Sequence, residues 1–181
     1  FLEIAALTNG EIVNYANIAS ECGVSAQTVK SYFDILEDTL VGYMIPAYTK
    51  VIKRRLVQAP RFFFFDVGLT NHLLRRESLV RGTPEYGHAF EHFVILELLA
   101  YIGYNHKEEK LSYWRTHSGI EVDVVIGNAL LAIEIKSAEE VQKRHLKGLR
   151  SFGDDEPECR KIIVSLDRIN REVDGIELLY I

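Results

Sequence analysis

Residues 121–137 constrain the fold most, because they form two strand-like runs that carry charges where a sheet core has none. The segment is EVDVVIGNALLAIEIKS. Val, Ile and Leu dominate both runs, as is typical of buried strands. The Gly-Asn pair at 127–128 is typical of a two-residue hairpin turn. Asp123, Glu134 and Lys136 interrupt the apolar pattern, so an antiparallel strand pair with a charged cluster is expected.

The register of this hairpin predicts that the charged side chains converge on one face. A two-residue turn pairs Asp123 with Ala132, and the strand period of two places Glu134 and Lys136 on the same face. Asp123 and Glu134 are then diagonal neighbours, about 7–8 Å apart at the backbone. Glu121 would face Glu134 directly, either as a further metal ligand or as a strand-end charge near solvent.

This cluster has the composition of a metal-dependent phosphodiesterase site. Two buried carboxylates side by side are costly, and a divalent cation with a preference for oxygen ligands, Mg²⁺ or Mn²⁺, removes the conflict. Lys136 can offset developing negative charge or position an attacking water, with Asp123 and Glu134 as the metal ligands. Glu91 lies on an apolar helix face and is the candidate third acid. Glu97 in the same helix ranks below it.

The distribution of charge indicates an anionic partner at one place. The 181-residue chain has a net charge of −5, which argues against a protein that coats nucleic acid indiscriminately. Residues 50–81 nevertheless contain eight Lys or Arg and two acids, so this stretch carries +6. Two interpretations stay equally open: a basic patch that binds an anion, or a solvated basic hairpin.

Residues 1–80 are predicted to form a winged helix. Amphipathic helices are expected within 1–9, 15–23 and 24–39, and Gly23 and Ser25 supply a C-cap and an N-cap between the last two. Two β-prone runs at 40–48 and 54–66 flank a basic loop and would form the wing. The alternative to a DNA-binding role is a protein-interaction module. The candidate nucleic-acid contacts on the third helix and the wing are Lys30, Lys53, Arg54 and Arg55.

Residues 81–181 are predicted to form an α/β domain with a mixed sheet flanked by helices. Its long helix is expected at 86–103 and its amphipathic helix at 138–152. His88 and His92 lie one helical turn apart, but no third ligand accompanies them in the sequence, so a zinc site is disfavoured. The strands are expected at 111–116, 120–126, 129–136, 161–166 and 176–181.

Compartment and context follow from the remaining composition. Cys22 and Cys159 are too few for a disulfide framework or a zinc site, which favours a reducing, cytoplasmic interior. No apolar run is long enough to span a bilayer, and no segment resembles a signal peptide, so no membrane partner is expected. The first residue is Phe1 and not Met, which suggests a piece of a longer chain.

The residues of the cluster resemble a known nuclease motif. Asp123, ten intervening residues and then Glu134-Ile135-Lys136 look like the D…ExK core of the PD-(D/E)xK nuclease superfamily. A wider set of segments resembles the region of unassigned function that follows the P-loop module in a family of prokaryotic AAA-type ATPases. These segments are SYFDILEDTLVGYMIPAY, RRLVQAPRFFFFDVGLTNHLL, GHAFEHFVILELL, YWRTHSGIEVDVVI and AIEIKSAEE with LKGLRSF.

The resemblance implies a winged helix followed by a restriction-endonuclease-like fold, with an ATPase domain before it. It assigns Asp123 and Glu134 as metal-binding acids, Lys136 as the catalytic lysine and Glu91 as the acid on the first helix of the nuclease-like fold. No GxxxxGK[ST] motif occurs in this chain, so the chain itself is not the ATPase. The leading expectation is a Mg²⁺-dependent nuclease domain acting on DNA. The alternative is a non-catalytic nucleic-acid-binding or protein-interaction module that regulates the ATPase.

Overall fold

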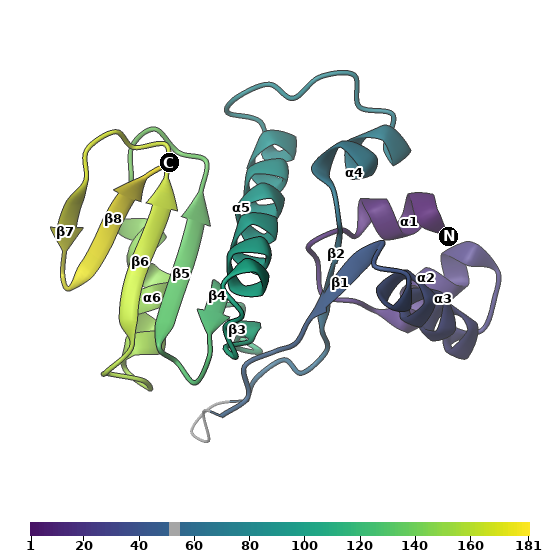
Figure 1. Cartoon of the computed structure of the whole chain (residues 1–181), viewed down its shortest axis with the longest axis horizontal. Coiled ribbons are helices and arrows are strands. Elements are labelled where there is room, and N and C mark those ends of the chain that lie inside the picture. Colours follow the sequence, from purple (N-terminus) through teal and green to yellow (C-terminus); the bar gives the residue numbers. More distant parts are fainter. Residues whose placement is uncertain (51–54) are drawn as a thin grey trace. The chain divides into compact units, whose positions relative to one another are not determined.

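The computed structural model describes residues 1–50 and 55–181 and divides the chain into two compact units (Figure 1). The division after Leu79 lies next to the expected boundary between 80 and 81. The segment Pro46–Gln58, however, belongs to unit 2, whereas the sequence assigned it to the winged helix. Unit 1 consists of Phe1–Ile45 and Ala59–Leu79, and unit 2 of Pro46–Gln58 and Val80–Ile181.

In unit 1 a short turn joins the second helix to the third, at the place where the sequence predicted it. Gly23 ends the second helix in the left-handed conformation with φ 67°, and its N–H bonds the carbonyl of Ala19. The Ser25 side chain accepts the N–H of Thr28 at 3.1 Å and caps the third helix. The elements of unit 1 are α1 (Leu2–Leu7), α2 (Tyr15–Cys22), α3 (Ala26–Asp38), β1 (Gly42–Ile45), β2 (Arg61–Phe64) and α4 (Val67–Leu73).

The aromatic run in β2 builds the core of unit 1. The ring centroid of Phe62 lies 4.9 Å from that of Phe33 and 5.1 Å from that of Phe64. These three side chains are fully buried with those of α2 and α3, whereas Phe65 is half exposed. Phe62, Phe63 and Phe64 are therefore part of the core. Asp66 caps α4 by accepting the N–H of Leu69.

Unit 2 is a six-stranded mixed sheet in the order β3-β4-β5-β6-β8-β7. The pairs β5–β6 and β6–β8 are parallel, and the other pairs are antiparallel. The elements are α5 (Pro84–Tyr104), β3 (Leu111–Arg115), β4 (Glu121–Ile126), β5 (Leu131–Lys136), the 3₁₀ helix η1 (Lys143–Leu146), α6 (Lys147–Gly153), β6 (Arg160–Ser165), β7 (Arg171–Val173) and β8 (Ile176–Tyr180).

The prediction of an amphipathic helix at 138–152 is wrong for residues 138–142. Only Lys143–Gly153 is helical, as η1 and α6. The preceding residues are not helical, and there the Val141 N–H donates to the carboxylate of Asp167 at 2.9 Å and the Val141 side chain is buried. A tertiary hydrogen bond thus replaces the first helical turn. The short strand β7 was not predicted.

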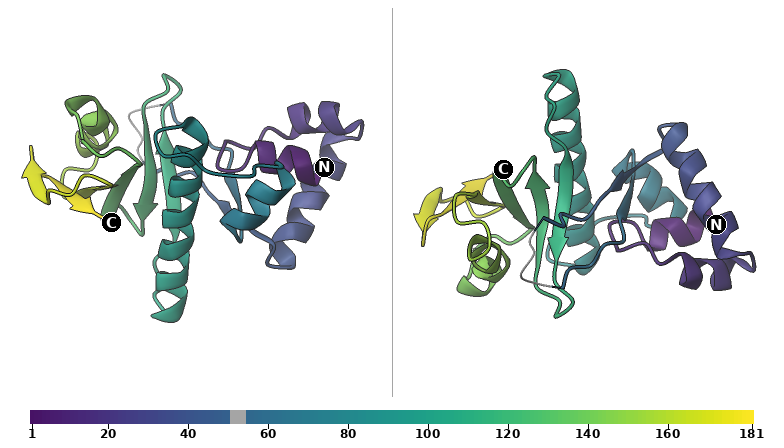
Figure 2. Two further views of the ribbon diagram at one scale, coloured as in Figure 1. Left: turned by 90° about the horizontal axis from the view of Figure 1, so that it is seen from above. Right: turned by 90° about the horizontal axis from the view of Figure 1, so that it is seen from below.

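Helices cover both faces of the sheet. Figure 2 shows α5 and α6 on opposite sides of the sheet. The α6 side contains a core in which Leu149 and Phe152 pack with Trp114, Val125 and Ala132 of the strands. This layering leaves the carboxyl ends of β5, β6 and β8 together at one edge, because these three strands are parallel.

The segment before and after the undescribed residues joins the sheet of unit 2. Ala47 forms a bridge with Tyr113 and Leu56 forms one with Thr116. The Tyr48 hydroxyl donates to Glu156 at 2.8 Å, and its ring packs edge-on against Phe152. The residues beyond β1 and before β2 thus extend the layer around β3.

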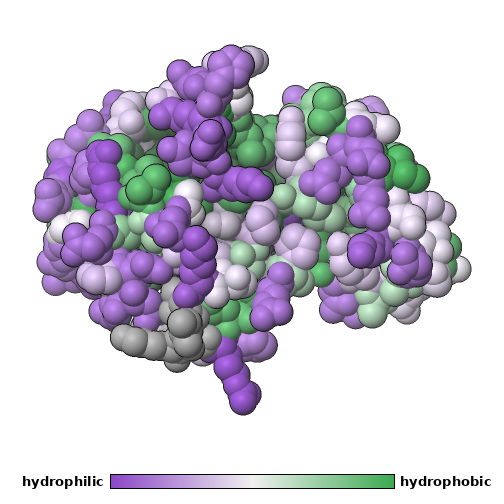
Figure 3. Space-filling model, turned by 60° about the horizontal axis from the view of Figure 1, so that its bottom comes forward, coloured by the Kyte–Doolittle hydropathy of each residue, from purple (hydrophilic) through white to green (hydrophobic). Residues whose placement is uncertain are grey.

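No helix in the described ranges is long and apolar enough to cross a membrane. Hydrophilic side chains spread over the face drawn in Figure 3, with smaller apolar areas between them. Both cysteines of the chain are free.

Candidate active site

The hairpin that carries the charged cluster has a different register from the predicted one. Val125 pairs with Ala132 and Ile126 with Leu131, so four residues form the turn instead of two, and the predicted pairing of Asp123 with Ala132 is wrong. The shift is two residues, which is the period of a strand, so each side chain keeps its predicted face.

Asp123 lies at an irregularity of β4. Ser112 of β3 pairs with Val125, whereas Trp114 pairs with Val122. β4 therefore has one extra residue at this point, the count that defines a β-bulge. The pairing of β4 with β5 ends nearby, at Val124 and Ile133.

The Asp123 carboxylate accepts a backbone hydrogen bond from β5 beyond the point where the pairing of β4 with β5 ends. Its Oδ2 accepts the backbone N–H of Ile135 at 2.8 Å, a donor that would otherwise need a partner across the strands. The Asp123 residue is only 3% exposed. The bulge and this hydrogen bond together hold one carboxylate oxygen in a fixed place between two diverging strands.

Lys136 joins the two acids. Its Nζ lies 2.7 Å from Oε1 of Glu134 and 3.5 Å from Oδ2 of Asp123. Glu134 is 6% exposed, whereas the Lys136 side chain is one-third exposed. The structure thus brings together the three residues that the sequence predicted, with two buried carboxylates on one ammonium group that reaches solvent.

The electrostatics of the cluster are unbalanced toward negative charge. Burial raises the pKa of Glu134 well above its usual value, and the Asp123 carboxylate raises it further, whereas Lys136 opposes the shift. Burial alone would lower the pKa of Lys136, but the charges of Asp123, Glu134 and, less strongly, Glu91 outweigh it and raise that pKa. A further positive charge would find a favourable position here.

Helix α6 packs closely against the cluster at Gly148. A Cβ atom at Gly148 would lie 1.9 Å from the carbonyl oxygen of Glu121 and 3.3 Å from Oε2 of Glu134. Only glycine allows this approach, because any side chain would overlap the β4 backbone. Oε2 of Glu134 is buried, and no atom of residues 1–50 and 55–181 donates a hydrogen bond to it.

Helix α5 approaches the same strand end. A Cβ at Gly87 would contact the hydroxyl of Ser137 at 3.5 Å, one residue after β5. Glu91 follows one helical turn later and is partly buried. Its charge raises the pKa of Lys136 slightly, so Glu91 lies within electrostatic range of the cluster.

The donor set partly fits a divalent cation. Two carboxylates share one ammonium, and the second oxygen of Glu134 is buried without a hydrogen-bond donor among the described residues. Within residues 1–50 and 55–181, however, no group of three or more His, Cys, Asp or Glu side chains has an arrangement ready to hold a metal ion. Glu91 therefore does not stand beside Asp123 and Glu134 as a completed third ligand.

The sequence of unit 2 settles the family. Residues 86–181 match a family model described as a domain of unknown function, DUF4143, and this match covers more than half of the chain. The chain belongs to the DUF4143 family. Residues 1–79 match a second model with the same kind of description, DUF8612. No curated protein and no solved structure matches this DUF4143 chain.

The weaker candidates in the DUF4143 domain are Glu121, His88, His92 and Glu97, and they have different surroundings. Glu121 forms an ion pair with Arg115 at 3.1 Å and is partly exposed, which favours the strand-end interpretation. His88 is exposed and His92 is buried, so the two do not present a common pair of ligands. Glu97 is exposed on α5.

The expected nucleic-acid contacts are divided between the two units. Lys30 is exposed on α3 of unit 1, and Arg55 is exposed in unit 2, where its carbonyl accepts the N–H of His117 at 3.1 Å. Lys53 and Arg54 lie outside the described residues. The four residues are thus not shown to form one surface.

Two contributors to the site were missed in the sequence. Gly148 interrupts an otherwise amphipathic helix, and an isolated helical glycine often marks a close approach. His145 of η1 lies near enough for the charge of Lys136 to act on it; burial, Arg144 and then Lys136 lower the pKa of His145. No spacing in the sequence indicates that η1 folds over the end of β5.

Proposed function

We propose that this DUF4143 domain is a metal-dependent nuclease with Asp123, Glu134 and Lys136 at its active site. The observation that carries the proposal is the pair of buried carboxylates on one ammonium, with Oε2 of Glu134 left without a donor in the part of the chain that the structure describes. A structural ion-pair cluster would satisfy that oxygen, because an unpaired buried polar atom costs free energy. A bound Mg²⁺ or Mn²⁺ would use it.

The roles follow from the positions of the side chains. Asp123 and Glu134 would hold the cation, with Glu91 supporting from α5. The cation would supply Lewis-acid stabilisation of the phosphate and a more acidic bound water. Lys136 reaches solvent beside both acids, so its ammonium can orient the attacking water and offset charge on the scissile phosphate.

The substrate proposed for this site is DNA, with unit 1 acting as a winged helix that positions it. The turn between α2 and α3 and the exposed Lys30 on α3 support this role. The DUF4143 family is often found at the C-terminus of AAA ATPases, which supports an ATPase domain as the partner in a longer chain.

The direct experiment is calorimetric titration of Mg²⁺ and Mn²⁺ together with cleavage assays on linear, branched and single-stranded DNA and on RNA. Asp123→Asn should lose metal binding and cleavage together. Lys136→Ala should keep metal binding and lose about 10²-fold in rate if the ammonium stabilises the transition state. Glu97→Gln, at an exposed acid of α5, is the control for Glu91→Gln. This control variant should change neither metal binding nor cleavage. If no metal binds at millimolar concentration with nucleic acid present, the catalytic proposal is wrong.

A second candidate is a non-catalytic regulatory module of the ATPase that binds nucleic acid or protein. The absence of a ready group of three metal ligands among the described residues favours it. In that case Lys136 is the permanent counter-ion of the two acids. Metal binding without cleavage of any substrate, tested also with the ATPase domain attached, would support this alternative.

A further inference from the structure

A pocket of about 320 Å³ lies beside the candidate active site, at the same edge of the sheet. Leu166 to Ile169 follow β6 and form part of its wall, and Tyr180 ends β8. Lys136 pairs with Ser165, so the pocket wall begins one residue beyond the direct neighbour of Lys136. Adjacent strands are about 4.8 Å apart, so this wall lies near the end of β5.

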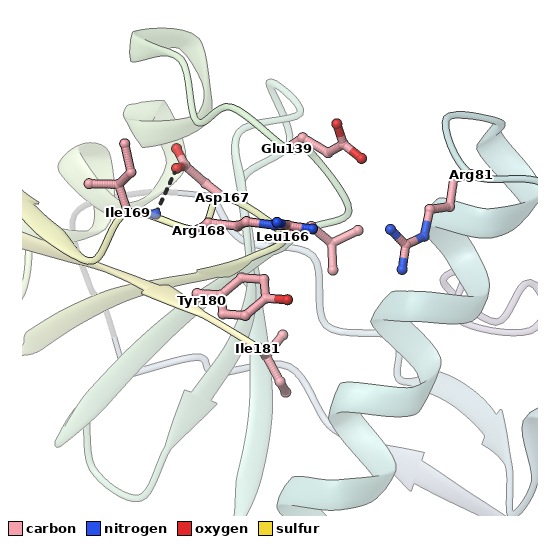
Figure 4. Close-up of a pocket in the computed structure, with 8 residues that line it drawn as sticks. All are labelled: Arg81, Glu139, Leu166, Asp167, Arg168, Ile169, Tyr180 and Ile181. Carbon is pink, nitrogen blue, oxygen red and sulfur yellow. Dashed lines mark hydrogen bonds between the residues drawn. The ribbon is translucent and has the colours of Figure 1, made fainter.

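Two arginines supply the positive charge of this pocket. Figure 4 shows the guanidinium groups of Arg81 and Arg168 directed toward each other across it. They come from the segment before α5 and from the loop after β6. Neither guanidinium has an ion pair or hydrogen bond with the part of the chain that the structure describes. Glu139 is the acid on the rim and offsets one of the two charges.

The other acid of the pocket does not cancel the second charge, because it is already paired. The Asp167 carboxylate is 2.8 Å from Arg171 and accepts the N–H groups of Val141 and Ile169. These contacts lower its pKa to about 2, with the Arg171 hydrogen bond as the largest cause. They also fix the loop that carries Arg168, so the loop is held in place without any contribution from the Arg168 guanidinium.

The remaining lining favours a nucleotide over a bare ion. The Tyr180 ring and the Leu166 side chain form an apolar wall, and the Tyr180 hydroxyl lies on the side of the two arginines (Figure 4). Guanidinium groups bind phosphate through paired N–H donors, and aromatic rings accept bases or sugars by stacking. The volume lies at the lower end of small-ligand sites, which suits one nucleotide and excludes a duplex.

We propose that this pocket binds a phosphate group of a nucleic-acid strand, together with its nucleotide, next to the phosphate at the Asp123–Glu134–Lys136 cluster. The inference deepens the proposed function and rests on its nucleic-acid substrate. The pocket fixes the position of the strand relative to Lys136. It therefore determines which phosphodiester bond reaches the site.

The test is fluorescence anisotropy of a labelled single-stranded DNA oligonucleotide with the intact chain, without divalent metal so that no cation bridges the carboxylates and the strand. Arg81→Gln and Arg168→Gln should each weaken binding by about 3- to 10-fold and reduce the slope of log affinity against log salt by about one. Arg160→Gln is the matched control, because Arg160 begins the strand that Arg168 follows and lies at the opposite end of β6. It should leave binding unchanged.

A second arm compares the oligonucleotide with and without a 5′-phosphate. Tighter binding of the phosphorylated strand, lost in Arg168→Gln, identifies a terminal phosphate; equal binding identifies an internal one. If both arginine variants bind as the parent does with an unchanged salt slope, the pocket proposal is wrong, although the nuclease proposal stands. If the parent binds no strand at low salt, the pocket proposal also fails, and the cleavage assay decides the nuclease proposal separately.

Discussion

Replacing Lys136 with Met removes the ammonium that two buried carboxylates share, and this change tests the electrostatics of the cluster directly. Removal of one partner from a fully buried pair costs about 3–5 kcal/mol. The Lys136 side chain is one-third exposed, so we expect a smaller loss, about 2–3 kcal/mol at pH 7. The loss should shrink as Glu134 takes up a proton.

The dependence on pH has a definite sign. The pKa of Glu134 lies above the usual 4.5, so between pH 4.5 and that pKa the folded state binds more protons than the unfolded state. Stability therefore falls as pH rises through this window. Lys136→Met raises the pKa of Glu134 further, and each added unit corresponds to about 1.4 kcal/mol at pH 7 that is recovered at acid pH. The difference between variant and parent should be smaller at pH 5 than at pH 7.

Urea unfolding followed by tryptophan fluorescence suits this measurement. Trp114 is the single tryptophan of the chain and lies in the core of unit 2, so its signal reports the unit that contains the cluster. Lys147→Met, at an exposed lysine of α6, is the matched control and should change stability by less than about 0.5 kcal/mol. A loss equal at both pH values, or no greater than that of the control, would refute the description of two buried acids stabilised by Lys136.

Three further changes test other contacts. Gly148→Ala should destabilise unit 2 by about 1–3 kcal/mol in the same fluorescence assay, since its Cβ would overlap a β4 carbonyl; Gly103→Ala, with open space around it, should not. Asp167→Asn should lower stability at neutral pH through loss of the Arg171 contact, and its difference from the parent should narrow as pH falls from about 3.8 toward about 2, where the parent carboxylate is protonated. Ser25→Ala should cost unit 1 about 1 kcal/mol by circular dichroism, because it removes a cap, whereas Ser25→Asp should retain it.

The sequence predicted which side chains of β4 and β5 share a face of the sheet, but it did not predict which residues of the two strands pair. The Gly127-Asn128 pair favoured a two-residue turn, but the turn extends to Leu130, with Ala129 in the left-handed conformation at φ 56°. A shift of one residue would have moved Asp123 and its neighbours to the other side of the sheet. The shift is two, so local alternation was enough to place the charged cluster.

The contacts that complete the site depend on distant parts of the chain, which local patterns do not show. The pairing of β4 with β5 ends at Val124 because β4 has a bulge against β3. Beyond this point the Asp123 carboxylate accepts the N–H of Ile135. The unwound residues before Lys143 result from the hydrogen bond between Val141 and Asp167. Propensity favours a helix there, and tertiary contacts override it. Composition alone also did not assign residues 46–58 to the second unit.

The membership of the segment Pro46–Gln58 means that the polypeptide passes between the two units three times, after Ile45, after Gln58 and after Leu79. A single proteolytic cut after Leu79 would therefore not release two separate domains. The amino-terminal fragment would retain Ala47 and Leu56 bridged to β3, and Tyr48 hydrogen-bonded to Glu156. A nicked molecule should elute as one species until denaturant opens unit 2. A gene fragment that begins at residue 81 would encode a sheet without the strand neighbours that cover Tyr113.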